Sequence, residues 1–238
     1  MTRGFARRAL ATALLAVCCV LPACAKEPAA QPAASAPQAA APAVPAGDWS
    51  VGTNYNVLAR PQPVDAPPGK VAVVEFFWYG CPHCAALDPL IEAWKTKKPA
   101  YIEFSRTHIV WSPLHEQHAK IFYTLQALGR MDLHPKVFEA IHVEKNLLAA
   151  QDEAQARALH QAFFEKCGVS KKDFDAAYDS MSVQMNVQRA LEETRRFAID
   201  NVPTMVINGT YVTNVSMAGG PERLLQLVEY LAARDKPR

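Results

Sequence analysis

Two cysteines separated by two residues, in the Cys-Pro-His-Cys at 81–84, are the residues of this sequence best suited to chemistry. Their spacing lets the two sulfurs meet within one helical turn, where they can form and release a disulfide. The thiolate is the nucleophile in such exchange, so the pKa of the attacking cysteine decides its reactivity. The motif predicts a redox-active pair in which Cys81 reacts with other proteins and Cys84 is the resolving thiol.

The residues around the motif predict a strand, a tight turn and a helix. From Val71 the chain is apolar and rich in β-branched and aromatic residues, as in a strand buried on both faces. Gly80 ends this run, Cys81 is suited to the helix N-cap, and Pro82 is suited to the first helical position. We expect the helix to continue to about Lys97.

The predicted helix start gives a physical reason for a reactive Cys81. Unpaired backbone N–H groups and the positive end of the helix dipole stabilise a thiolate at this position. His83 lies between the two cysteines and adds a cationic or hydrogen-bonding contribution. Because the thiolate is stabilised, the dithiol is favoured over the disulfide, which is then readily passed to another protein.

Other uses of the two cysteines fit the sequence less well. A zinc site would need a second pair of cysteines or histidines at finger-like spacing, which the sequence lacks. Haem attachment requires a histidine directly after the second cysteine, and Ala85 stands there. A structural disulfide at this spacing would close a very short loop and stabilise little.

The remaining histidines and one further cysteine predict no additional chemistry. The His-Glu-Gln-His at 115–118 resembles a zinc-protease signature but is one residue short, so we expect a helix surface there. Cys167 is expected to be a small buried apolar side chain rather than a third redox group. Four other histidines show no ligand pattern and are expected to be surface or hydrogen-bonded residues: His108, His134, His142 and His160. We therefore expect no metal.

Glu75 interrupts the apolar strand six residues before Cys81. A buried carboxylate is costly unless it has a partner or a function. One interpretation is an edge strand that points Glu75 to water. The other is a carboxyl with a raised pKa that relays the proton of Cys84, directly or through water.

The N-terminus predicts export. Three arginines precede an apolar segment at 9–20 that is too short for an ordinary membrane span, which indicates an export signal over 1–25. The Leu-Pro-Ala-Cys at 21–24 resembles a lipobox, with cleavage before Cys24 and lipidation of its side chain. The Ala-Cys-Ala at 23–25 also fits ordinary signal cleavage, which would release a soluble protein.

Residues 26–47 are almost entirely Ala, Pro, Gln and Ser, so they predict a disordered tether. The whole chain of 238 residues carries 25 basic and 23 acidic residues, and three of the basic ones lie in the export signal. The net charge of the protein is therefore close to zero after cleavage of the export signal. It gives no reason to expect binding to nucleic acid or to an anionic membrane surface.

Residues 48–238 predict one α/β domain. A weak strand over 55–60 and a strand over 101–110 accompany the central one, and the pattern from 112 to 197 is helical. Strands over 204–207 and 210–213 flank an Asn-Gly pair typical of a tight hairpin turn, and a helix over 221–233 ends the chain. This order fits a thioredoxin-like sheet interrupted by an inserted α-helical domain.

The sequence resembles the DsbA-type thiol:disulfide oxidoreductases of the bacterial periplasm from Tyr55 to Leu231. The similarity is carried by four groups of residues: Glu75-Phe76-Phe77, the Cys-Pro-His-Cys, Val202-Pro203 before the Asn-Gly hairpin, and Gly168-Val169 followed by Asp173 to Ala177. Cys-Pro-His-Cys alone is moderately specific, and the helical insertion with Val-Pro in the right place makes the match highly specific.

The resemblance implies several functional features. Pro203 is expected to follow a cis peptide bond and to face the dithiol, which leaves the Val202 backbone free to pair with an extended substrate. Substrates would be unfolded or reduced exported proteins, and a DsbB-like membrane quinone reductase would restore the disulfide. The family is known for a strongly lowered pKa of its first cysteine and for an oxidising disulfide. We expect a periplasmic monomer without cofactors.

The predicted activity is donation of the Cys81–Cys84 disulfide through a mixed disulfide with the substrate, with His83 and Pro82 shaping the helix start. An isomerase or reductase of the same fold is an alternative and would need a reductive supply. A metal chaperone that uses the two thiols as soft ligands is a second alternative. A structural module whose disulfide never turns over is a third.

Overall fold

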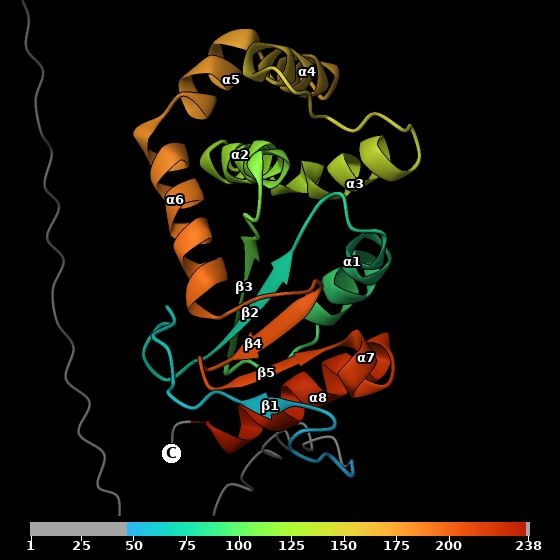
Figure 1. Cartoon of the computed structure of the whole chain (residues 1–238), viewed down its shortest axis with the longest axis vertical. Coiled ribbons are helices and arrows are strands. Elements are labelled where there is room, and N and C mark those ends of the chain that lie inside the picture. The colour runs from blue at the N-terminus through green and yellow to red at the C-terminus, as the bar shows by residue number, and fades with distance from the viewer. Residues whose placement is uncertain (1–46, 237–238) are drawn as a thin grey trace, which may run out of the picture. The chain divides into compact units, whose positions relative to one another are not determined.

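The computed structural model describes residues 47–236, which fold around a five-stranded sheet (Figure 1). The predicted export signal, the alternative lipidation site Cys24 and nearly all of the predicted tether lie outside the described residues. The strand order is β1-β5-β4-β2-β3, with β2 parallel to β3 and antiparallel to β4. The strands are β1 (Asn56–Val57), β2 (Val71–Phe77), β3 (Ile102–His108), β4 (Thr204–Ile207) and β5 (Tyr211–Asn214).

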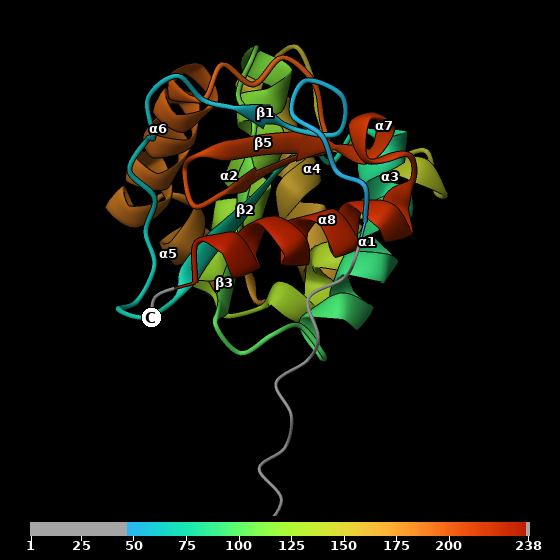
Figure 2. The same ribbon diagram turned by 90° about the horizontal axis from the view of Figure 1, so that it is seen from below.

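Strand β2 is central and buried on both faces, as its apolar composition predicts. Val71 and Val73 lie in one core cluster with residues of helices α1 (Pro82–Lys95) and α8 (Pro221–Arg234). Figure 2 shows these two helices beside each other. Val74 and Phe76 point to the opposite face, where they pack with Phe197. The alternation places Glu75 on the face that α1 covers.

Along the chain, a block of helices follows β3 and precedes β4, so the predicted insertion into a thioredoxin-like sheet is confirmed (Figure 1). Helices α2 and α6 pack on each other and both contact β3. Phe197, which directly follows α6, packs on the second face of the sheet. The block comprises α2 (Pro113–Ala127), a 3-10 turn (Met131–Leu133), α3 (His134–His142), α4 (Glu153–Lys166), α5 (Lys171–Tyr178) and α6 (Met181–Arg196).

The predicted hairpin is also confirmed. Asn208 and Gly209 both have positive φ, 50° and 62°, as a type I′ turn requires. A Cβ on Gly209 would lie 1.8 Å from the carbonyl oxygen of Gln62, so glycine is required there by packing as well as by backbone conformation.

Element boundaries differ from the predictions by a few residues. Helix α1 ends at Lys95, two residues early, and the first strand is limited to the two residues of β1. The short helix α7 (Val215–Ala218), which follows β5 directly, was not predicted because four residues carry too little periodicity. Within residues 47–236, no helix is both long and apolar enough to cross a membrane.

Candidate active site

The Cys-Pro-His-Cys motif lies at the start of α1, as the sequence predicts. Cys81 is the N-cap with an extended backbone, and Pro82 is the first helical residue. The backbone N–H of Cys84 donates a hydrogen bond to the Cys81 Sγ over 3.4 Å. Both cysteines are free thiols in the structure. The N-terminal N–H groups of α1 are therefore directed at the sulfur of Cys81.

The surroundings of Cys81 favour its thiolate. Its pKa falls to about 6, chiefly because the Cys84 thiol donates a hydrogen bond to it, and burial opposes this effect. Backbone N–H groups of Cys84 and His83 lower the pKa further, and so does the charge of His83. Pro82 and His83 are exposed at the surface. The predicted helix terminus and His83 both contribute, but the partner thiol contributes more.

Cys84 is held in the opposite state. Its side chain is 1% exposed, whereas Cys81 retains 7%. Burial raises the pKa of Cys84 strongly, and the hydrogen bond to Cys81 and the negative charge of Glu75 add to the increase. Cys81 is thus poised as a thiolate that keeps a small exposed fraction, and Cys84 as a fully buried thiol, as thiol–disulfide exchange with a second protein requires.

The loop before β4 faces the dithiol. The Val202–Pro203 peptide bond is cis, as the family resemblance implied. The Val202 carbonyl oxygen accepts a hydrogen bond from the Cys81 thiol, with 3.5 Å between Sγ and O. Residues more than a hundred positions apart in the sequence therefore meet at the reactive sulfur.

Glu75 is buried and ion-paired, so the edge-strand interpretation is wrong. Its side chain is 3% exposed, and Arg106 donates from Nε to its Oε2 over 2.7 Å. The two residues are direct neighbours in the register of β2 and β3. Burial raises the pKa of Glu75 above its usual value, and Arg106 opposes that shift. The predicted direction of the Glu75 pKa shift is thus confirmed.

Arg106 joins Glu75 to two further carboxylates on α1. Its guanidinium also reaches Asp88 Oδ1 and Glu92 Oε1, each over 2.8 Å. Three acids therefore surround one buried cation directly beneath the redox helix. This cluster could not be identified from the sequence stretch around the cysteines. The one indication of the cluster in the sequence is Arg106 itself, a basic residue on the same strand face as the apolar Ile102 and Phe104.

Three histidines hold Tyr79, which lies two residues before Cys81. The Tyr79 N–H donates to His108 Nε2 over 3.3 Å, and its carbonyl oxygen accepts from His142 Nε2 over 2.8 Å. Its hydroxyl is hydrogen-bonded to His134 Nδ1 over 2.7 Å. These histidines come from β3 and α3, so the turn that precedes the cysteines is fixed by both halves of the fold. Their prediction as hydrogen-bonded residues is confirmed.

Two predictions about lone residues need correction. His118 is fully buried rather than on a helix surface, because it accepts a hydrogen bond from Trp78 Nε1 over 3.0 Å and donates to the Leu147 carbonyl over 2.8 Å. Cys167 is half-buried rather than buried, because it stands at the C-terminal end of α4. In the described part of the chain, no three His, Cys, Asp or Glu side chains are grouped to hold a metal ion.

Sheet, inserted helices and dithiol together define a thioredoxin-like thiol:disulfide oxidoreductase. A thioredoxin family model matches residues 66–228. The thiol:disulfide interchange protein DsbA of Pseudomonas aeruginosa is 38% identical over 195 residues, which cover 82% of this chain and 89% of that protein. The DsbA of Burkholderia cepacia is 41% identical over 181 residues, covering 76% and 82%.

Solved structures agree with this similarity. The crystal structure of P. aeruginosa DsbA matches with a TM-score of 0.73 at 38% identity, covering 79% of this chain and 95% of that one. That of the oxidoreductase DsbA from Xylella fastidiosa matches with a TM-score of 0.70 at 27% identity, covering 78% and 97%. The chain belongs to the DsbA family of thiol:disulfide interchange proteins.

Proposed function

We propose that this protein is an oxidase that donates its Cys81–Cys84 disulfide to exported proteins as they fold. The observation that carries the proposal is the opposite state of the two thiols. The pKa of Cys81 falls to about 6, whereas that of the buried Cys84 is strongly raised. A stabilised Cys81 thiolate favours the reduced form of the protein, and its disulfide is correspondingly a good oxidant.

The reaction consists of two exchanges. A substrate thiolate attacks the Cys81 Sγ, the Cys81–Cys84 bond breaks, and Cys84 leaves and takes up a proton. A second substrate thiolate then attacks the substrate sulfur of the mixed disulfide, and Cys81 leaves as a thiolate. The substrate has lost two electrons to form its disulfide, and the protein has gained them as a dithiol.

Glu75 supplies the proton in the first exchange. Cys84 is a poor leaving group without protonation because its pKa is strongly raised. Burial raises the pKa of this carboxyl, which lies on the sheet face beneath α1, and so favours the protonated form that can pass its proton to the sulfur, directly or through water. The charge of ionised Glu75 raises the pKa of Cys84, so the two groups interact electrostatically, which supports this role.

The neighbouring residues position the two partners. Pro82 begins the helix, and His83 contributes its N–H group and its charge to the Cys81 thiolate. Pro203 places the Val202 carbonyl beside the reactive sulfur, where it can hydrogen-bond an extended substrate backbone. In the reduced protein the same carbonyl accepts a hydrogen bond from Cys81 Sγ when that sulfur is protonated.

Reoxidation and location complete the proposal. A DsbB-like membrane quinone reductase would accept two electrons from the dithiol, in the periplasm, where disulfides persist. Export rests on the predicted signal over 1–25, with Cys24 as the lipidation site in one of its two interpretations. Labelling cells with a radioactive fatty acid distinguishes the two, because only a lipidated wild type, and not Cys24→Ser, would carry the label.

The deciding experiment is the equilibrium of the purified protein with reduced and oxidised glutathione, with Cys167→Ala as control for side reactions. We expect the Cys81–Cys84 disulfide to be much more oxidising than glutathione. A strongly reducing pair would instead identify a reductase of the same fold. A pair that resists mild reductant would identify a structural disulfide.

A further inference from the structure

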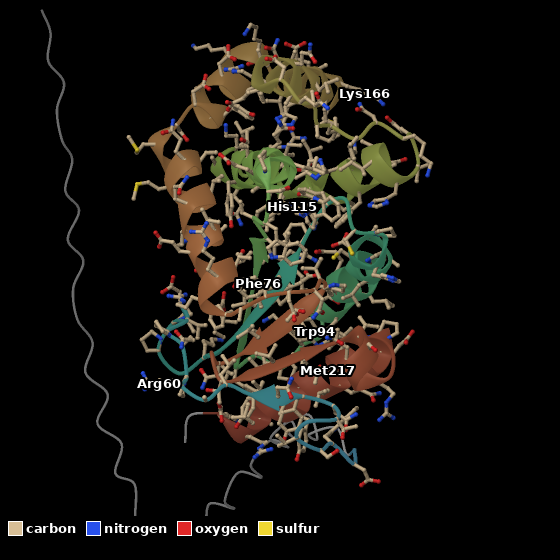
Figure 3. The ribbon with its side chains drawn as sticks, viewed as in Figure 1. Arg60, Phe76, Trp94, His115, Lys166 and Met217 are labelled. Carbon is tan, nitrogen blue, oxygen red and sulfur yellow. The ribbon has the colours of Figure 1, made fainter. Side chains whose placement is uncertain are left out.

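A line of three aromatic rings lies beside the reactive cysteine, and none of the steps above uses it. The ring centroids of Trp78 and His115 are 4.6 Å apart, and those of His115 and Trp111 are 5.3 Å apart. We call Trp78, His115 and Trp111 the aromatic strip. Its members come from the turn after β2, the first turn of α2 and the connection that precedes α2. Figure 3 labels His115, which lies in α2 on the side of that helix toward the strands.

One end of the aromatic strip lies against the redox motif. The indole of Trp78 covers Gly80, the residue directly before Cys81. A Cβ on Gly80 would lie 2.3 Å from an atom of that ring, so the close contact requires glycine. The Trp78 Nε1 donates to His118, which fixes the ring orientation. An apolar surface therefore begins next to the sulfur that receives the substrate.

The other end is fastened to the loop that carries Val202. The indole Nε1 of Trp111 donates to the carbonyl oxygen of Ile199 over 2.9 Å. Ile199 lies four residues before Pro203 in the loop whose Val202 carbonyl contacts Cys81. The aromatic strip thus joins the two segments that border the reactive sulfur, and it is continuous with the site already described.

Trp111 remains open to a ligand. It is 43% exposed, although its polar N–H is already bonded within the protein, so the exposed part of the ring is apolar. A hollow of about 440 Å³, bordered by Leu191 and Ala198, lies against Trp111. A second hollow of about 470 Å³, bordered by Leu114 and Leu147, adjoins the first at Pro113.

We propose that the aromatic strip is a substrate subsite for an aromatic side chain close in sequence to the reacting cysteine. The inference rests on the proposed function, because the ligand is the same reduced polypeptide. Unfolded chains expose aromatic side chains that folded proteins bury, so such a subsite would favour unfolded substrates. Aromatic pairs prefer ring separations of about 4.5–7 Å, and the open face of Trp111 allows a fourth ring to join the strip at such a distance.

The geometry limits where the aromatic residue stands. A bound substrate cysteine lies at Cys81, and an extended chain advances about 3.3 Å per residue. Contact with the aromatic strip therefore needs about two to five residues between the cysteine and the aromatic side chain. Because the loop binds the backbone in one direction, the preference should exist on one side of the cysteine only.

The test uses the oxidised full-length protein and a series of short peptides with one cysteine. A phenylalanine, or an alanine as reference, is placed one to seven residues before or after that cysteine. The measured quantity is the ratio of the rates at which the phenylalanine and alanine peptides form the mixed disulfide. We expect a ratio of about three to ten at the favoured positions. Trp111→Ala should reduce it to about one, and Trp111→Phe should restore part of it.

Met181→Ala is the matched control, because Met181 is also a large exposed apolar side chain, at the start of α6. This variant should keep the wild-type ratio. A ratio near one at every position in the wild type, or a preference that survives in Trp111→Ala, would overturn the subsite alone. A protein whose disulfide reacts with neither the peptides nor glutathione would overturn the proposed function as well.

Discussion

Arg106 donates from its Nε to Oε2 of Glu75 over 2.7 Å, and both side chains lie almost entirely out of solvent. The pair is set by the parallel register of β2 and β3, which brings the two residues level with each other. Asp88 and Glu92, both on α1, also form ion pairs with this guanidinium. The redox helix is therefore attached to the sheet by a buried charge cluster as well as by apolar packing.

Replacing Arg106 by methionine should destabilise the fold strongly. The variant would leave up to three carboxylates near one another without a cation, and breaking a buried pair in this way costs about 3–5 kcal/mol. Denaturant unfolding at neutral pH measures the loss. Arg106→Lys keeps the charge and should lose less. A methionine variant as stable as the wild type would show that the cluster does not attach α1 to the sheet.

Glu75→Gln should fold but exchange disulfides slowly. An amide cannot transfer the proton that Cys84 requires, and a positioned general acid accelerates such steps by about 10² to 10⁴. Stopped-flow measurement of mixed-disulfide formation from pH 5 to 8 tests this. Glu103→Gln is the matched control, because Glu103 lies on the opposite face of β3. Equal rates for Glu75→Gln and the control across the range would remove Glu75 from the mechanism.

The local elements around the site could be predicted from the sequence because each has its own signal. The apolar run of β2, the Cys-Pro start of α1 and the Asn-Gly turn are all encoded by neighbouring residues. Arg106 could not be assigned as the partner of Glu75 in this way. Its pairing depends on the register of two parallel strands joined through a helix, and no neighbouring residue specifies that register.

His118 shows a second limit of local patterns. The spacing of His115 and His118 does not fit a zinc site, and the remaining local expectation for a polar residue on a helix is an exposed face. Helix α2 contacts α5, α6 and β3, and its residues 121–125 are all buried. A helix enclosed on several sides buries polar residues too, and they are then satisfied by hydrogen bonds such as that from Trp78.

Cys84→Ala should raise the pKa of Cys81, whereas Cys84→Ser should keep it closer to the wild-type value of about 6. The largest influence on Cys81 is the hydrogen bond from the Cys84 side chain, and serine retains a donor that alanine lacks. Titration of thiolate absorbance measures both variants. His83→Ser in the same series should raise the pKa less than Cys84→Ala does. If alanine and serine titrate alike, the backbone N–H groups dominate instead.

The buried histidines should make the protein less stable in acid. Burial lowers the pKa of His118 to about 4, against 6.5 for an exposed imidazole. A neutral buried histidine stabilises the fold fully above the unfolded pKa, and this contribution is lost as the pH falls toward the folded value. The loss for His118 between pH 6.5 and 4 should be about 3 kcal/mol. His160, whose pKa is also lowered to about 4, should add a similar amount.

The free energy of unfolding measured by denaturant from pH 7 to 4 tests this directly. His118→Gln should be less stable than the wild type at pH 7, because the hydrogen bonds of His118 to Trp78 and Leu147 are altered. Its stability should nevertheless fall less steeply with acid, because one buried proton acceptor has been removed. His115→Gln is the control. Because His115 is only half-buried, its replacement should leave most of the decrease in the free energy of unfolding with falling pH. Parallel curves for the wild type and His118→Gln would mean that His118 does not titrate over this range.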